Sequence, residues 1–261
     1  MSDEDIPQKL DKRVAYSLAK LEKEQRILRT HESERAVFEE VFDKPTLMTL
    51  YDMMNANVFK QLNGVVASGK ESRVYWGVTS SNASVAVKIC LVASAEFKNR
   101  LKYIAGDPRF RNVKKGMRNI VGVWARKEFS NLKRAYYSKV PVPRPIFVKE
   151  NVLVMEFIGE DGTPAPTLNT CEVTHKHYVG ALKTMSKLYK AKLVHADLSE
   201  FNIFLHKDKK IILFDFGSAV DIAHPNSDQF LIRDISNVNR FFSKRGIDVY
   251  DLNKAIKAVK T

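Results

Sequence analysis

Two patterns of apolar positions divide the chain. In residues 1–48, apolar positions such as Leu10, Val14, Leu18 and Leu21 fall three or four residues apart in a charged segment without glycine. This spacing places them on one face of a helix and predicts one or two amphipathic helices. We therefore expect a helical N-terminal extension that packs on the part of the chain that follows.

Residues 49–155 begin with the end of a further helical stretch, LMTLYDMMNANVF, and then change to the period of two that is typical of strands. The segment SRVYWGVT alternates in this way, the turn SSNAS follows it, and SVAVKICLV is rich in β-branched residues. A basic stretch, about 94–122, comes next, followed by the helical sequence WARKEFSNLKRAYYSK and a second hairpin, IFVKENVLVMEFIG. These elements predict a small antiparallel sheet with one helix.

Residues 156–261 return to helical spacing. The helical segments are THKHYVGALKTMSKLYKA, QFLIRDISNVNRFFSKR and VYDLNKAIKAVK, with short strand-like pieces between the first two. A sheet lobe followed by a mainly helical lobe is the layout of a two-lobed α+β protein with a cleft between the lobes. We expect the chemistry to lie in that cleft.

The composition is that of an ordinary globular protein, with 44% hydrophobic and 28% charged residues. No apolar run approaches the roughly 20 residues that a membrane helix needs, and the N-terminus lacks the features of a signal peptide. Cys90 and Cys171 lie far apart without a CxxC partner, so we expect two buried packing residues. The chain is therefore expected to be cytoplasmic, with no membrane partner.

The net charge of +13 is unevenly distributed. Residues 94–127 contain ten Lys or Arg and two acids. Such a balance is typical of a protein that contacts a polyanion such as RNA, although a solvated surface explains charge alone equally well.

The stretch Gly64–Gly77, GVVASGKESRVYWG, begins like a phosphate-binding P-loop but has Glu71 where that motif needs Ser or Thr. A P-loop also leads into a helix, whereas this stretch leads into a predicted strand. We interpret it as a hairpin that covers a nucleotide from above. The backbone N–H groups of Ser68, Gly69 and Lys70 would then contact the phosphates, and the Lys70 side chain would add a charge.

Lys88 ends the sequence Val85-Ala86-Val87-Lys88, so a lysine lies within an apolar strand. An uncompensated buried ammonium costs several kcal/mol, so it requires an anionic partner unless the side chain reaches solvent. We expect Lys88 to contact nucleotide phosphates and to be tethered by Glu128, which is set among apolar positions of the predicted helix.

Two further motifs follow. His195 to Asn202 fits H-x-D-x-x-x-x-N, and Asp215-Phe216-Gly217 begins thirteen residues beyond Asn202. Asp197 would accept or orient the proton of an attacking hydroxyl group, and Asn202 and Asp215 offer hard oxygen ligands for Mg²⁺. Gly217 would allow the tight turn that directs Asp215 into the cleft. We expect His195 to hold the loop in place.

Taken together, these motifs resemble a protein kinase fold and, more narrowly, the RIO family of atypical protein kinases. The resemblance covers most of the chain from about residue 60 and rests on four stretches: Ala67–Ser72, Tyr103–Phe110, Val194–Asn202, and His224–Asn226 with Phe230–Asp234. The N-terminal segment is more similar to the RIO branch with simple N-terminal helices than to the branch with a winged helix.

The chain also departs from ordinary protein kinases. Ala196 stands where they have the arginine that clamps an activation-loop phosphate, and no Ala-Pro-Glu follows Asp215-Phe216-Gly217. The sequence instead runs almost directly into a helix. The basic stretch at about 94–122, which separates Lys88 from Glu128, resembles the flexible loop of RIO proteins. We expect no activation segment and no switching by phosphorylation of such a segment.

The resemblance implies phosphoryl transfer from ATP, with Mg²⁺ or Mn²⁺, to Ser or Thr of a protein substrate or of the chain itself. It also implies a role in maturing the small ribosomal subunit, either as a kinase or as an ATPase in which Asp215 carries a transient aspartyl-phosphate. The basic residues 94–127 would dock on rRNA or the pre-ribosomal particle. At the adenine, backbone groups of Glu156 and Ile158 would bind the base edge, and Met155 would shape the pocket.

Two other functions remain open at this point. One is a small-molecule kinase of the aminoglycoside-phosphotransferase type, which shares H-x-D-x-x-x-x-N but would more often carry an acidic second lobe for cationic substrates. The other is a pseudokinase that acts only as an RNA-binding or ribosome-binding module. The presence of every catalytic residue type argues against this second alternative.

Overall fold

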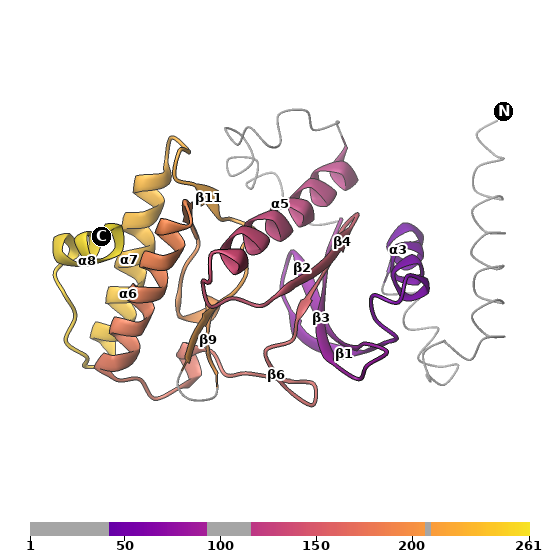
Figure 1. Cartoon of the computed structure of the whole chain (residues 1–261), viewed down its shortest axis with the longest axis horizontal. Helices are drawn as coiled ribbons and strands as arrows, with labels where there is room; N and C mark the ends of the chain where they lie inside the picture. The colour runs from indigo at the N-terminus through magenta and orange to yellow at the C-terminus, as the bar shows by residue number, and fades with distance from the viewer. Residues whose placement is uncertain (1–41, 93–115, 207–209) are drawn as a thin grey trace.

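A computed structural model describes residues 42–92, 116–206 and 210–261. Within these residues the chain forms two lobes, one built around a sheet and one mainly helical (Figure 1). This arrangement confirms the predicted two-lobed α+β fold. The expected N-terminal helices lie almost entirely in residues 1–41, outside the described residues.

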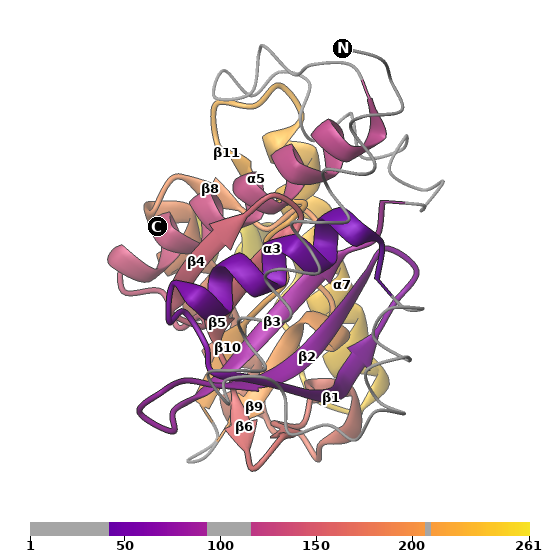
Figure 2. The same ribbon diagram turned by 90° about the vertical axis from the view of Figure 1, so that its right-hand side faces the viewer.

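The first lobe contains a five-stranded antiparallel sheet with the strand order β1-β2-β3-β5-β4. Its strands are β1 (Gln61–Ser68), β2 (Ser72–Val78), β3 (Ser84–Cys90), β4 (Pro145–Lys149) and β5 (Val152–Glu156). Two helices belong to this lobe, α3 (Lys44–Asn55) and α5 (Met117–Tyr137). Figure 2 shows α3 lying across one face of the sheet.

The central strand β3 explains how the lobe is layered. Val85, Val87 and Ile89 alternate along it and belong to one apolar cluster with residues of α3. Ala86 and Lys88 point to the other face, where Ala86 joins the cluster that contains the α5 side chains. The strand is therefore buried on both faces, which is why it reads as a nearly continuous apolar run.

The predicted boundary between residues 48 and 49 falls inside α3. Asp43 caps this helix by accepting a hydrogen bond from the Thr46 N–H at 2.9 Å, and Pro45 lies in its first turn. The helix therefore begins directly after Asp43, before the predicted boundary. The helix belongs to the first lobe because side chains on both sides of the predicted boundary, Leu47 and Leu50, are buried.

The end predicted for the basic stretch also needs correction. Helix α5 begins at Met117, so residues 117–122 are helical and not part of a loop. Residues 94–115 lie outside the described residues.

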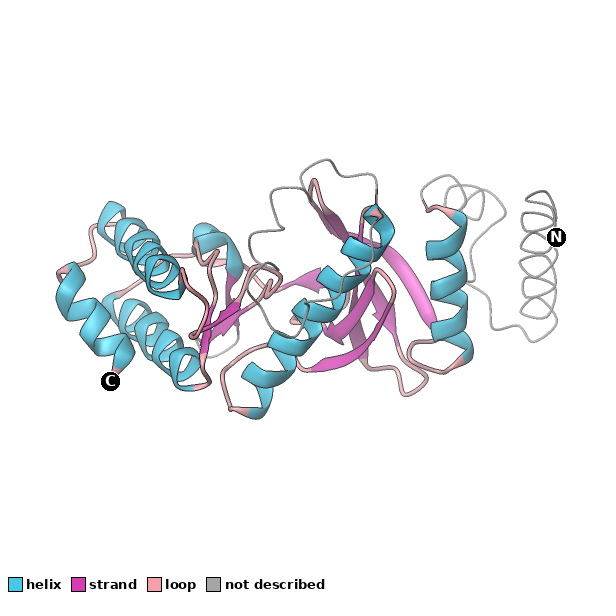
Figure 3. Ribbon diagram, turned by 90° about the horizontal axis from the view of Figure 1, so that it is seen from above, coloured by secondary structure: helices cyan, strands magenta, loops and turns pink. Residues whose placement is uncertain are grey.

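The second lobe is built on three helices, α6 (His175–Lys190), α7 (Ser227–Lys244) and α8 (Leu252–Lys260). They gather at the C-terminal end of the molecule (Figure 3). Three pairs of short strands also lie in this part of the chain: β6 (Gly159–Glu160) with β7 (Thr163–Pro164), β8 (Leu193–Val194) with β11 (Val220–Asp221), and β9 (Ile203–His206) with β10 (Lys210–Leu213). Two 3₁₀ turns, η2 (Leu168–Thr170) and η3 (Glu200–Asn202), complete the lobe.

Cys90 is buried, and its burial raises the pKa of its thiol to about 12. Cys171 is only partly buried, so the prediction that both cysteines pack in the core was wrong for Cys171, which lies in the loop between η2 and α6. None of the described helices is long and apolar enough to span a membrane.

Candidate active site

The glycine-containing stretch forms the turn between β1 and β2. The two strands are antiparallel, with Ser68 opposite Arg73, and the Gly69 N–H donates to the Ser72 carbonyl at 2.9 Å. No helix follows the turn, which confirms the hairpin and excludes a P-loop. Ser68, Gly69 and Lys70 are exposed at its tip, as contacts to a ligand would require.

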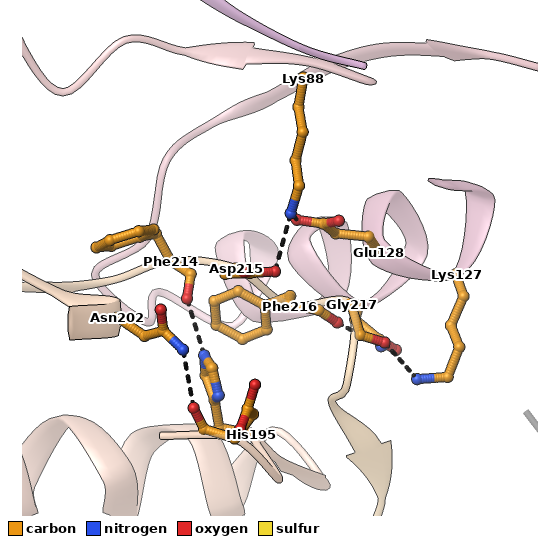
Figure 4. Close-up of polar contacts among 11 residues, drawn as sticks. Lys88, Lys127, Glu128, His195, Asn202, Phe214, Asp215, Phe216 and Gly217 are labelled. Carbon is orange, nitrogen blue, oxygen red and sulfur yellow. Dashed lines mark hydrogen bonds and ion pairs between the residues drawn. The ribbon is translucent and has the colours of Figure 1, made fainter. Parts of the chain in front are cut away.

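Lys88 lies at the centre of the site, between two carboxylates. Its Nζ donates to Glu128 Oε1 at 2.7 Å and to Asp215 Oδ1 at 2.9 Å. Figure 4 shows Lys88 reaching from the sheet towards both acids, which come from α5 and from the segment after β10. Three residues predicted from separate motifs therefore meet in one ion-paired group.

The burial of this group settles the two alternatives for Lys88. Lys88 is 7% exposed and Glu128 is 1% exposed, so the lysine does not reach solvent. Burial alone would lower the pKa of Lys88, but the Asp215 and Glu128 carboxylates raise it above its ordinary value. Lys88 is thus held as a cation, while the side chain of Asp215 stays 42% exposed and open to a ligand.

Asp197 lies in the loop between β8 and η3, with its side chain exposed. The Asn202 Nδ2 donates to the Asp197 backbone carbonyl at 2.8 Å, so the two ends of the motif are tied together. Ala196 has a φ of 63°, a conformation that costs energy for a residue other than glycine. The loop is therefore held in its shape by its surroundings.

Asp234 of α7 supplies much of that support. Its carboxylate accepts hydrogen bonds from the Ala196 N–H at 2.8 Å and from the Leu198 N–H at 3.0 Å. Burial raises the pKa of Asp234 to about 7, against the opposite effect of these two hydrogen bonds. Arg233 and Asn237 donate to the Ala196 and Leu198 carbonyls. The backbone on both sides of Asp197 is thus fixed to α7.

His195 has the structural role predicted for it. Its ring is buried and 5.0 Å from the Phe216 ring, and its Nε2 lies 2.9 Å from the Phe214 carbonyl. Because a carbonyl only accepts, Nε2 must carry the proton. Burial lowers the pKa of His195, so the ring is neutral at pH 7. It links the loop of Asp197 to the segment of Asp215.

Gly217 is needed for a different reason from the one predicted. The residue with a positive φ in this turn is Asp215, at 63°, whereas the φ of Gly217 is not positive. A Cβ on Gly217 would lie 2.7 Å from the Trp124 Nε1, inside contact distance. Glycine is therefore required because α5 approaches the backbone closely.

Sequence reasoning missed two residues of α5 that contact the same turn. Lys127 Nζ donates to the Gly217 carbonyl at 2.9 Å and to the Ala219 carbonyl. Asn131 Nδ2 donates to the Ala219 carbonyl at 2.8 Å and to the Phe216 carbonyl at 3.2 Å. Lys127 was assigned to the RNA-binding stretch 94–127, which was wrong because its side chain is fully buried.

The residues predicted to hold adenine follow the junction of the two lobes. Met155 is buried in the core, and Glu156 is the last residue of β5. The Glu156 N–H already donates to the Arg144 carbonyl, so this group does not serve the adenine. The Ile158 N–H has no hydrogen bond among the described residues, which leaves it and the Glu156 carbonyl as the candidates.

The donor chemistry of the site suits Mg²⁺ held together with nucleotide phosphates. Asn202 and Asp215 supply an amide oxygen and a carboxylate, the ligand types that Mg²⁺ prefers. In the described part of the chain no three His, Cys, Asp or Glu side chains gather around a metal position. Mg²⁺ commonly takes only one or two carboxylates and completes its shell with phosphates and water.

Residues 218–226 connect Gly217 to α7 and include β11, which pairs with β8. No separate lobe or long loop lies between them, as the sequence predicted. The turn after Asp215 is instead held by the side chains of Lys127 and Asn131 on α5.

Comparison with known proteins agrees with this geometry. A family model described as the RIO domain matches residues 73–255. A RIO-type serine/threonine-protein kinase Rio1 from Methanocaldococcus jannaschii is 39% identical over 236 residues, which cover 89% of this chain and 79% of that protein. The serine/threonine-protein kinase RIO1 of Caenorhabditis elegans is 37% identical over 234 residues, covering 87% of this chain and 46% of the relative. The chain thus spans less than half the length of the nematode protein.

A solved structure has a similar fold. The Rio2 kinase of Chaetomium thermophilum, in a complex named as ADP/Mg²⁺-phosphoaspartate, matches with a TM-score of 0.62 at 22% identity. The match covers 81% of this chain and 66% of that chain. The residues that carry the sequence motifs, their geometry and these matches lead to one conclusion: the chain belongs to the RIO family of atypical serine/threonine kinases.

Proposed function

We propose that this protein transfers the γ-phosphoryl group of Mg·ATP to a serine or threonine hydroxyl, on a protein substrate or on itself. The observation that carries the proposal is the position of Lys88, 2.7 Å from Glu128 and 2.9 Å from Asp215. A buried cation in contact with a partly exposed carboxylate suits a bound triphosphate and its metal. The names of the relatives, all serine/threonine kinases of the RIO type, support the same activity.

The residues of the site divide the work of the reaction. The Lys88 ammonium orients the α- and β-phosphates, and Glu128 keeps that ammonium in place. Bound Mg²⁺ supplies charge neutralisation for the phosphate oxygens. Asp215 and Asn202 would hold this ion.

In the transfer step the substrate oxygen forms a bond to the γ-phosphorus while the bond from this phosphorus to the β,γ-bridging oxygen breaks, and ADP leaves. The hydroxyl proton passes to the Asp197 carboxylate. Asp234 keeps the backbone of Asp197 fixed during this step, so the carboxylate needs little reorganisation.

A second route uses Asp215 as the nucleophile. One carboxylate oxygen attacks the γ-phosphorus, ADP leaves, and water then hydrolyses the aspartyl-phosphate to phosphate and free carboxylate. The exposed side chain of Asp215 supports this route, as does the phosphoaspartate named in the Rio2 complex. The protein would then act as an ATPase.

We further propose that the partner is the pre-ribosomal small subunit or its rRNA. The support is the family resemblance and the charge of the basic stretch. Of the ten Lys or Arg in residues 94–127, seven lie in residues 94–115, outside the described residues. Among the other three, Arg126 is exposed, Arg118 pairs with Asp43 and Lys127 is buried.

The variant Asp197→Asn tests the transfer step. We expect it to bind ATP as the wild type does and to lose roughly 10²- to 10⁴-fold in turnover, because the proton acceptor is removed. Binding is measured by calorimetry and turnover with γ-labelled ATP. The matched control is Asp248→Asn, the same change at an exposed carboxylate outside the site. Equal turnover in the wild type and in Asp197→Asn would remove Asp197 from the mechanism.

A further inference from the structure

One face of α5 contacts the turn that follows Asp215. Lys127, Asn131 and Arg134 are four and three residues apart, so they lie along one side of the helix. Lys127 and Asn131 together donate four hydrogen bonds to the carbonyls of residues 216, 217 and 219. Arg134 pairs with Asp221 at 2.6 Å. The whole segment 216–221 is thereby fastened to α5.

The two side chains that donate these hydrogen bonds are unusually deeply buried for polar groups. Lys127 is 0% exposed and Asn131 is 0% exposed. A buried ammonium is costly unless its hydrogen atoms are accepted, and here the backbone of the turn accepts them, with the Trp124 ring 5.4 Å from the Lys127 Nζ. An apolar side chain would fill this space without that cost, so packing alone does not account for a lysine.

The same helix also holds the side chain of Asp215. Glu128, next to Lys127 in sequence, binds Lys88, and Lys88 binds Asp215. Figure 4 shows both contacts: Glu128 points to Lys88, and Lys127 points to the Gly217 carbonyl. Helix α5 therefore holds both the carboxylate of Asp215, through Lys88, and the backbone that follows Asp215.

We propose that Lys127 and Asn131 are positioning residues for residues 216–219, the turn that follows the proposed Mg²⁺ ligand Asp215. They fix residues 216–219 so that the Asp215 carboxylate keeps its place beside Lys88, where it would hold Mg²⁺. Helix α5 and the turn then move as one unit, since separating them would break all of these hydrogen bonds together. This inference rests on the proposed function, because it assigns the residues to the same site.

The test compares Lys127→Met and Asn131→Leu with the wild type and with Lys133→Met. Each of the first two changes removes the donors and keeps a side chain of similar size. Lys133 is exposed on the same helix and makes no contact with the turn, so it is the matched control. Circular dichroism and thermal melting establish that each variant is folded.

Two measurements then separate positioning from general stability. Calorimetry with ADP as the probe gives its affinity once in EDTA and once in excess Mg²⁺. Hydrogen exchange on the nucleotide-free protein gives the protection of residues 214–221. Neither measurement depends on turnover.

We expect both variants to bind ADP in EDTA within about twofold of the wild type, while the gain in affinity from Mg²⁺ falls roughly 10- to 100-fold, the usual effect of losing a group that orients a metal ligand. Exchange in 214–221 should become faster, and Lys133→Met should behave as the wild type.

Unchanged Mg²⁺ dependence and unchanged exchange in the folded variants would overturn the inference. An equal loss of ADP affinity in EDTA and in Mg²⁺ would also overturn it, because it would show a collapsed site. If Lys127→Met does not fold, Asn131→Leu decides; if neither folds, the two residues are structural and the positioning role is rejected. A wild type that binds Mg·ADP but transfers no phosphoryl group would refute the proposed function and leave this inference standing.

Discussion

Lys88 shows how a single residue reports on the whole site. A lysine in the middle of an apolar strand is unfavourable by itself, and this conflict with the local pattern pointed to an anionic partner. The structure supplies two such partners, Glu128 and Asp215. The prediction succeeded because burial of a charge leaves few alternatives.

His195 provides a prediction about pH. Burial lowers its pKa in the folded protein. At any pH where the ring binds a proton in the unfolded chain but not in the folded protein, protonation favours the unfolded chain. The contribution of His195 to stability is therefore complete above the unfolded pKa of about 6.5 and is lost as the pH falls towards the lower, folded value. The loss is at most about 1.4 kcal/mol per pH unit.

Chemical denaturation at pH 8 and at pH 5.5 measures this effect as the difference between the wild type and His195→Gln. The difference cancels the titration of other groups, including Asp234, whose raised pKa acts in the opposite direction. We expect the stability advantage of the wild type over His195→Gln to shrink at pH 5.5. An advantage that is constant with pH would show that His195 keeps an ordinary pKa.

Other residues could not be assigned from the sequence. Asp234 lies in one of the stretches that carry the family resemblance, but its partners are backbone N–H groups more than 30 residues away in the sequence. Lys127 and Asn131 have polar side chains four residues apart in a predicted helix, which is a visible signal. Their acceptors are carbonyls about 90 residues further on, and periodicity carries no information about such pairs.

At the scale of elements, the first hairpin shows which of two phosphate-binding structures the chain has, a P-loop or a hairpin that covers a nucleotide. The sequence around Gly69 matches the P-loop motif up to Lys70; Glu71 departs from it, and the alternation that follows indicates a strand and not a helix. The antiparallel register of β1 and β2 confirms the strand. Element types were predictable here because their periods differ strongly, while the ends of α3 and α5 were misplaced by several residues.

The contact of α5 with the turn gives a prediction for Gly217→Ala. The added methyl group would lie 2.7 to 2.9 Å from three atoms of the Trp124 indole, so the helix or the turn must shift. We expect a loss of about 1–3 kcal/mol in the free energy of unfolding and at least tenfold lower turnover, because Asp215 moves with the turn. Denaturation and a labelled-ATP assay measure the two effects.

Gly180→Ala is the control for this change. Its Cβ would meet Ile211 at 3.4 Å, an ordinary contact, and alanine favours the helix α6 in which it lies. A second variant, Gly217→Ala with Trp124→Phe, should recover part of the loss because it removes the clashing ring atoms. Full activity of Gly217→Ala alone would contradict the close approach described here.

At the scale of the whole molecule, the sequence shows a strong positive charge, but the described structure does not show where most of the basic stretch lies. The net charge is +13, and most of the basic stretch lies outside the described residues. The two-lobed arrangement follows from the order of the periods along the chain. The way in which the lobes meet follows from side-chain contacts such as those of Lys88, which no local pattern encodes.

The proposed RNA contact predicts a salt effect. Replacing Lys98, Arg100 and Lys102 by Gln should weaken binding to small-subunit rRNA and reduce the slope of log K against log salt by roughly 0.7 for each RNA phosphate that is no longer neutralised. Filter binding at several salt concentrations measures both quantities. Replacing Lys176, Lys183 and Lys190, exposed residues of α6, changes the net charge equally and is the control. Equal slopes for the two triple variants would show that the basic stretch only carries solvated charge.

The most direct test of the proposed activity follows the γ-phosphoryl group through a single turnover of labelled Mg·ATP with the purified protein. Label is scored on the protein, in free phosphate and in a form released by hydroxylamine, for the wild type and for Asp215→Asn. We predict transfer by the wild type, with label either on serine or threonine or in a hydroxylamine-sensitive form that Asp215→Asn abolishes. Stoichiometric binding of Mg·ATP with no transfer to protein or water would contradict this activity and identify a binding module.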